Sequence, residues 1–213
     1  MSPAMTDLIP STQNADPYAA LQAATRLHRA KHGCGAFTFE DGPALTRLAQ
    51  AKQAHRILEL GTALGYTACC LTHGSPHAHL DTIEGDPEHV RQARAHIAHY
   101  DLQSRITVHS GDFDAVLATL QPGYDMAFFD GFAPALHTVL HMRNLLGKGG
   151  LLICSNLQLG SGREARQLAA ELADPTHWQP LAPIEGGQTH VFAKRLDGVA
   201  IVTNEDGAPA NKK

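Results

Sequence analysis

Short apolar runs that alternate with helical patterns are the feature that most constrains the fold of this chain. The apolar runs are rich in Ile, Leu, Val and Phe and occupy residues 56–60, 79–84, 105–109, 124–129 and 150–155. Helical patterns lie between them, at residues 66–73, 87–99, 113–120 and 134–146. Strands that alternate with helices form a mainly parallel sheet with helices on both faces. The sequence therefore predicts a doubly wound, Rossmann-like α/β fold.

Two helices are expected before this alternation begins. Residues 18–33 are rich in alanine and carry apolar residues at helical spacing, and Asp16 before Pro17 is typical of a helix start with the aspartate as cap. A second helix is predicted after Asp41.

The end of the chain predicts a hairpin. A helix is expected at 161–173, and residues 177–184 and 188–196 then resemble two strands joined by a turn at 185–187. These two strands would complete a seven-stranded sheet whose last strand is antiparallel. Trp178 is expected to pack against that sheet.

Length and composition favour one globular domain. The chain has 213 residues, of which 43% are hydrophobic and 18% charged, and this excludes the disordered and membrane classes. We predict a domain at 16–200, with flexible segments at 1–15 and 201–213. The net charge of −4 gives no reason to expect a nucleic-acid partner, and no apolar run is long enough to span a membrane.

The four cysteines show no paired metal-binding spacing. They are Cys34, Cys69, Cys70 and Cys154, and we interpret them as reduced core residues. Together with an N-terminus that lacks the basic and apolar regions of a secretory signal, they predict a cytoplasmic protein.

The loop after the first predicted strand is the first candidate binding element. The stretch RILELGTALGYTACCL, residues 56–71, leaves a buried strand through two glycines. A dinucleotide fingerprint would need further glycines where this chain has Ala63 and Tyr66, so a nicotinamide-dependent oxidoreductase is disfavoured.

Acidic residues lie at the ends of four successive predicted strands. They are Glu59, Glu84, Asp112 and Asp130, and the carboxyl ends of parallel strands meet at one edge of a sheet. S-adenosylmethionine (SAM) is a cation without a pyrophosphate, so a glycine turn with nearby carboxylates suits it. In such a site Glu84 would accept hydrogen bonds from ribose hydroxyls and Asp112 would reach the adenine amino group. Each acid alone could instead be a helix cap or a solvated charge.

These residues also carry a family resemblance. ELGTALGYT, residues 59–67, and FTFEDGPAL, residues 37–45, resemble motifs of the class I methyltransferases, within the caffeoyl-CoA and catechol O-methyltransferase-like family. The resemblance implies a SAM-dependent O-methyltransferase that acts on a small, aromatic acceptor, and a homodimer. The cofactor residues that it implies are Phe37, Glu59, Gly61, Thr67, Glu84, Gly85, Asp112, Phe113 and Asp130.

The metal motif of that family is incomplete here. Asp130 and Asn156 match two of its ligand positions, while Phe132, Ala133 and Ser155 replace two acids and a lysine. One carboxylate and one amide are a poor cage for Mg²⁺, so the chain is expected to bind a divalent cation weakly or to work without one. Asp130 is then expected to face either the methionine ammonium or the acceptor.

The missing lysine leaves the catalytic base open. His137 and His141 lie one turn apart on the helix predicted after Asp130, and His137 is the preferred base beside a catalytic Asp130. The histidines at 73, 77 and 79 are interpreted as a solvated loop. Leu157, Leu159 and Phe132 are expected to give the acceptor an apolar wall. Two alternatives stay open: an RNA-modifying methyltransferase, and a SAM-binding module without activity.

Overall fold

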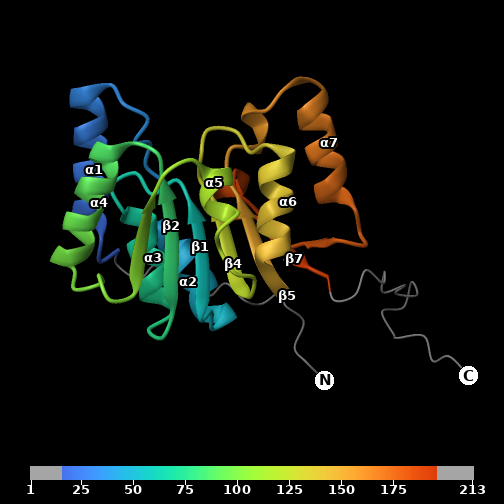
Figure 1. Cartoon of the computed structure of the whole chain (residues 1–213), viewed down its shortest axis with the longest axis horizontal. Coiled ribbons are helices and arrows are strands. Elements are labelled where there is room, and N and C mark those ends of the chain that lie inside the picture. The colour runs from blue at the N-terminus through green and yellow to red at the C-terminus, as the bar shows by residue number, and fades with distance from the viewer. Residues whose placement is uncertain (1–15, 196–213) are drawn as a thin grey trace, which may run out of the picture.

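A seven-stranded sheet forms the centre of the molecule, with helices on both of its faces (Figure 1). The computed structural model describes residues 16–195, so the predicted segments 1–15 and 201–213 and residues 196–200 lie outside the described part. The strands follow the order β3-β2-β1-β4-β5-β7-β6. The predicted doubly wound fold is confirmed.

The strands lie close to the predicted apolar runs. They are β1 (Arg56–Leu60), β2 (His79–Glu84), β3 (Ile106–Ser110), β4 (Tyr124–Phe129), β5 (Leu146–Cys154), β6 (Trp178–Pro180) and β7 (His190–Lys194). The first five are parallel to one another, and β7 runs antiparallel to both β5 and β6. The predicted C-terminal hairpin is therefore confirmed, and Trp178 is buried as expected.

The register of the central strands determines which residues meet at the carboxyl edge of the sheet. Leu60, the last residue of β1, pairs with Ile83 of β2 on one side and with Phe129 of β4 on the other. The next residues, Gly61, Glu84 and Asp130, therefore leave the sheet at the same level. The strand order reverses between β1 and β4, which is where ligands bind in open α/β sheets.

Two apolar cores, one on each face, hold the helices to the sheet. The first packs α1 (Ala19–His32), α2 (Gly42–Lys52), α3 (Tyr66–Gly74) and α4 (Pro87–His99) against side chains that include Ile57, Leu80 and Phe128. The second packs α5 (Phe113–Leu117), α6 (Leu136–Leu145) and α7 (Gly162–Ala173) against the alternate side chains, which include Leu58, Ile83 and Phe129. Since successive strand residues point to opposite faces, continuous apolar strands supply both cores.

The helix boundaries show one correction and one confirmation near the N-terminus. Asp16 does not cap α1: the helix begins at Ala19 after Tyr18, and the Asp16 carboxylate accepts hydrogen bonds from the Tyr18 amide and the Tyr66 hydroxyl. Asp41 does cap α2, since its side chain accepts a hydrogen bond from the Ala44 amide.

The helix after β3 is shorter than predicted. It ends at Leu117 rather than at 120, and the following residues form tight turns before Pro122. Conversely, β5 begins at Leu146, four residues before the predicted run, because its glycine-rich first half still pairs with β4 across a register shift.

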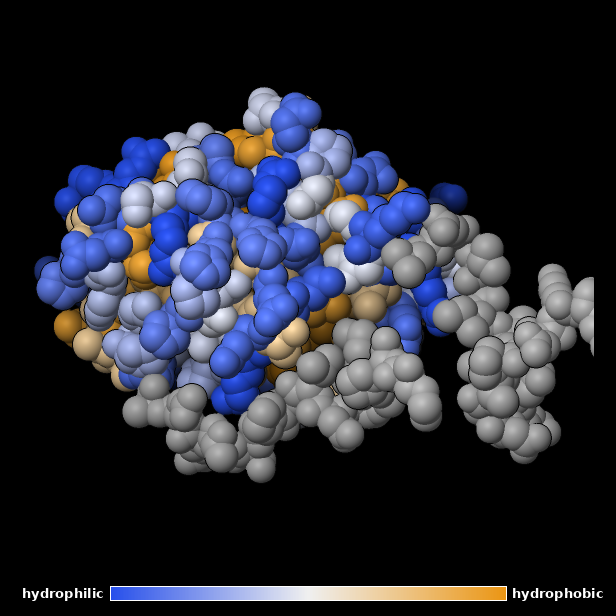
Figure 2. Space-filling view, turned by 90° about the horizontal axis from the view of Figure 1, so that it is seen from below, coloured by the Kyte–Doolittle hydropathy of each residue, from blue (hydrophilic) through white to orange (hydrophobic). Residues whose placement is uncertain are grey.

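Three further observations concern the class of protein: the state of the cysteines, the character of the helices and the polarity of the surface. All four cysteines are free, and three of them are buried. Within residues 16–195, no helix has both the length and the apolar character needed to cross a membrane. Figure 2 shows the molecule from below, where hydrophilic residues predominate.

Candidate functional site

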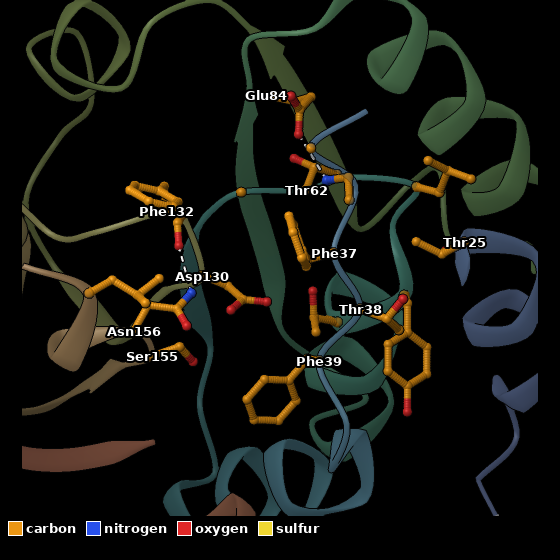
Figure 3. A pocket seen from close by; sticks show the side chains of 18 of the residues that line it. Thr25, Phe37, Thr38, Phe39, Thr62, Glu84, Asp130, Phe132, Ser155 and Asn156 are labelled. Carbon is orange, nitrogen blue, oxygen red and sulfur yellow. Dashed lines mark hydrogen bonds between the residues drawn. The ribbon is translucent and has the colours of Figure 1, made fainter. Parts of the chain in front are cut away.

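A cavity of about 440 Å³ opens at the carboxyl edge of the sheet, where β1 and β4 end (Figure 3). Most of its lining comes from six separate parts of the chain. These are the segment before α2, the turn after β1, the ends of β2 and β4, the loop after β5, and the turn before β7. The predicted cofactor residues that line it are Phe37, Gly61, Thr67, Glu84, Phe113 and Asp130.

The turn after β1 forms the floor of this cavity. Gly61 has a φ of +99°, and a Cβ atom there would lie 2.8 Å from the backbone oxygen of Asp130. Only glycine fits such a conformation at that distance. The first glycine of the turn is therefore required by the close approach of the β4 end, which lets both strand ends contribute to one site.

Glu84 is held rigidly beside this turn. One of its carboxylate oxygens accepts a hydrogen bond from the Ala63 amide at 2.8 Å, and the other accepts one from the Asp86 amide at 2.9 Å. Figure 3 shows the first of these bonds at the wall of the cavity. A carboxylate oxygen has more than one lone pair, so Glu84 still has acceptor capacity for a ligand hydroxyl.

Glu59 lies beneath the cavity rather than at its wall. It is inside β1, is fully buried, and accepts a hydrogen bond of 2.6 Å from the Thr82 hydroxyl, which in turn lies 2.5 Å from the Thr62 hydroxyl. Burial raises the pKa of the Glu59 carboxyl to about 7, and the hydroxyl of Thr67 and that of Thr82 oppose this shift. Glu59 is thus linked to the turn after β1 through the hydroxyls of Thr82 and Thr62.

Asp130 is the acid at the centre of the cavity wall. Burial raises its carboxyl pKa well above the ordinary value, and the neighbouring carboxylates of Glu59 and Glu185 raise it further, against a hydrogen bond with Ser155. Three carboxyl groups thus act on one another around this wall.

The cavity has no basic residue among the described side chains that line it. Its charged residues are Glu84, Asp130 and Glu185. Since the lining holds no lysine, arginine or histidine, these acids favour a cation there and disfavour a pyrophosphate. The lining therefore fits the sulfonium and ammonium groups of SAM.

The two candidate metal ligands share one wall of the cavity (Figure 3). Asn156 uses its amide nitrogen to donate a hydrogen bond of 2.8 Å to the backbone oxygen of Gly131. Ser155, next to it, pairs with the Thr189 hydroxyl at 3.0 Å. One amide oxygen and one carboxylate do not make the oxygen cage that Mg²⁺ prefers, so this donor set does not fit a resident magnesium ion.

Aromatic and aliphatic side chains surround the opening. Phe37, Phe132 and Leu159 line the cavity and are 64%, 79% and 46% exposed. The guanidinium of Arg29 lies 3.7 Å from the centre of the Phe37 ring. These side chains form a rim with apolar surface available for contact with a ligand.

Besides Glu59, five predicted residues lie away from the cavity lining. Leu157, which the sequence predicts in the apolar wall for the acceptor, packs against the second core instead. Asp112 is exposed and caps α5, and Gly85 is exposed beside Glu84. His137 is 64% exposed and contacts Asp114 at 2.7 Å, and His141 also faces Asp114. The structure thus brings neither histidine to the cavity, because the face of α6 that carries them packs toward α5.

The sequence interpretation missed the contribution of the turn before β7. Glu185 lines the cavity, accepts a hydrogen bond from the Glu40 amide at 3.1 Å and another from the Thr189 hydroxyl at 2.7 Å. Gln188, in the same turn, also lines the cavity. The only signal in the sequence is the Glu-Gly-Gly turn itself, which predicts a simple hairpin connection.

Comparison with known proteins agrees with this geometry. Residues 58–157 match a family model described as a methyltransferase domain. A relative from Mycobacterium sp. strain JLS, named "Putative O-methyltransferase", is 30% identical over 170 residues, which cover 71% of this chain and 77% of the relative. The chain belongs to the O-methyltransferase family. A catechol O-methyltransferase from Mycobacterium tuberculosis is 30% identical over 132 residues, or 60% of this O-methyltransferase and 59% of the relative.

Solved structures of O-methyltransferases share the fold. TomG from Streptomyces achromogenes, crystallised with SAM, superimposes with a TM-score of 0.72 at 21% identity, covering 85% of this chain and 91% of TomG. The Bacillus cereus enzyme, crystallised with SAH, gives a TM-score of 0.69 at 20% identity, covering 90% and 94%. The resemblance to class I SAM-dependent methyltransferases that the sequence predicts is confirmed.

Proposed function

We propose that this O-methyltransferase methylates a hydroxyl group of a small, partly apolar acceptor, such as a phenol, without a resident divalent cation. One observation carries the proposal: a single cavity combines acids, with no basic residue in its described lining, and an apolar rim. The acids suit the cationic methyl donor, and the rim made by Phe37, Phe132 and Leu159 suits the acceptor.

Methyl transfer requires the protein to position the acceptor against the methyl group and to remove the hydroxyl proton. SAM, when bound, supplies a methyl group that is already activated by its sulfonium. The bond formed is between that methyl carbon and the acceptor oxygen, the bond broken is the carbon–sulfur bond, and the hydroxyl proton must leave. Asp130 is the proposed proton acceptor, because its raised pKa makes it a stronger base than an ordinary carboxylate.

Cofactor binding is the first experiment. Calorimetry should give a complex with SAM and none with NAD⁺, because the carboxylates of the lining repel the pyrophosphate. Saturating NAD⁺ binding, or no binding of SAM, would overturn the proposal.

Turnover is the second experiment. A panel of phenols and aliphatic alcohols with labelled SAM should give methylated product that persists in EDTA. Asp130→Asn should lower kcat roughly 100-fold, the usual contribution of a general base, while SAM still binds. A chelator that abolishes activity, restored by Mg²⁺, would show that the metal-free part is wrong.

One prediction from the sequence, a homodimer, and one alternative, an RNA acceptor, remain beside this proposal. A homodimer follows from the family resemblance, and light scattering of the full chain tests it. RNA as the acceptor is disfavoured by the acidic lining of the cavity, since phosphates would meet Glu84, Asp130 and Glu185. Methylation of bulk tRNA in the labelled-SAM assay would reverse that preference.

A further inference from the structure

A second cluster of chemically active side chains lies outside the cavity, between α1 and α4. His28 belongs to α1, Cys34 follows that helix, and His89 lies in the first turn of α4. One ligand atom from each lies within 4.8 Å of the other two. It is the one such group of three among residues 16–195, and none of its members takes part in the proposed methyl transfer.

The local structure explains why these three side chains meet. α1 ends at His32, and Gly33 adopts a left-handed conformation with a φ of +62° that turns the chain back on itself. This turn returns Cys34 toward the helix that carries His28. α4 starts at Pro87 after its cap Asp86, which places His89 in the buried side of its first turn.

The ligand types are those of a borderline-soft metal ion. Two imidazoles and a thiolate are typical of zinc sites, in which Zn–N is about 2.0 Å and Zn–S about 2.3 Å, so that tetrahedral ligand atoms lie roughly 3.3–3.8 Å apart. The ligand atoms are now up to 4.8 Å apart, so side-chain rotations must move them about 1 Å closer to reach that geometry. His28 and Cys34 are partly exposed and have room for such rotations.

The rings of the two histidines in the cluster lie close together, and a third histidine, His32, lies beside them. The His28 ring lies 4.5 Å from that of His32 and 5.5 Å from that of His89, measured between centroids.

Each histidine also has a neighbour on its other ring nitrogen. Nδ1 of His89 lies 3.7 Å from a carboxylate oxygen of Glu84, and Nδ1 of His28 lies 3.2 Å from the side-chain nitrogen of Gln92. A carboxylate behind a histidine is the usual second shell of a metal site.

We propose that His28, Cys34 and His89 form a site for a borderline-soft divalent metal ion, of which Zn²⁺ is the best match, with water in the fourth position. The site is separate from the Asp130 and Asn156 wall and uses different ligand chemistry. Because Glu84 lies between His89 and the cavity, a bound ion would fix the same carboxylate that forms part of the cofactor wall.

Cobalt is the probe that tests this site, because a thiolate bound to Co²⁺ gives a near-ultraviolet charge-transfer absorption. Untagged, chelator-treated protein titrated with Co²⁺ should develop this absorption to one equivalent, and Zn²⁺ should remove it. Cys34→Ser should abolish the absorption. His28→Gln should weaken Co²⁺ binding at least tenfold, since it removes one of three protein ligands.

His99→Ala is the matched control. It removes an exposed histidine of α4 that is not part of the cluster, and it should leave the absorption and the affinity unchanged. SAM binding by each variant confirms that it is folded. The proposal is overturned if no charge-transfer absorption develops, if it persists in Cys34→Ser, or if His28→Gln and His99→Ala bind Co²⁺ equally well.

Discussion

The two halves of the cavity are built in different ways. The wall beside β1 and β2 consists of residues that directly follow paired strands, and backbone amides hold Glu84 in place. The wall beside β4 and β5 depends on distant segments, for example the turn at Glu185, which contacts Glu40 across 145 positions of sequence. The first wall is fixed by local structure and suits a constant cofactor. The second depends on loops, which can vary without disturbing the sheet.

Glu84→Ala gives the largest expected effect and tests the first wall. Two hydrogen bonds from ribose hydroxyls to a carboxylate are each worth about 1.5–3 kcal/mol, so SAM affinity should fall roughly 1000-fold by calorimetry. Glu88→Ala removes an exposed carboxylate four residues further on and should leave the affinity unchanged. An equal loss of SAM affinity in both variants would mean that the overall negative charge, and not the fixed position of Glu84, determines SAM binding.

Glu59→Gln tests the buried carboxyl beneath the cavity through the pH dependence of the free energy of unfolding. The folded protein holds this proton with a pKa of about 7, against an ordinary value of 4.5, so Glu59 makes stability fall as pH rises from about 4.5 to 7. The difference amounts to about 3 kcal/mol above pH 7. Urea unfolding at pH 5 and pH 8 should show a smaller decline for the variant than for the native chain, and an identical decline would refute the buried titration.

Phe132→Ala tests the second wall. The side chain is 79% exposed, so the fold should be unaffected, but an acceptor that packs on the ring loses apolar contact. We expect the KM for a phenolic acceptor to rise about tenfold, the equivalent of 1.4 kcal/mol, with SAM affinity unchanged. A matched loss of SAM affinity would instead place the ring on the cofactor.

His137→Ala gives the smallest expected effect and tests whether this residue lies outside the catalytic site. The sequence favours this residue as the base, whereas in the structure it pairs with Asp114 on the surface, outside the cavity lining. An exposed ion pair contributes about 0–1 kcal/mol, so turnover should stay within about twofold. A tenfold fall in kcat would restore His137 to the mechanism.

The same contrast explains how much the sequence could predict. The strands, the glycine turn and the acids at the ends of β2 and β4 follow from local patterns and parallel register, so the fold and the first wall could be predicted. Glu185 could not, because its place in the cavity depends on how β7 returns beside β5. The face of α6 that carries His137 could not be oriented either, since both sides of that helix bear polar residues.

The cluster of His28, Cys34 and His89 could not be predicted from the sequence either. Its spacing has no paired cysteine motif, and two of its members lie more than fifty residues apart on helices whose packing no local pattern determines.

The reversed direction of β7 has one more consequence. A strand that runs against its neighbours begins where they finish, so the connection leading into it, rather than the one leaving it, arrives at the reactive rim. The turn before β7 therefore lies at the same edge of the sheet as the ends of β1, β4 and β5. A deletion of β7 and the turn before it would remove one of the two strands that pair with β5. It would also expose Ser155 and Asp130 to bulk water.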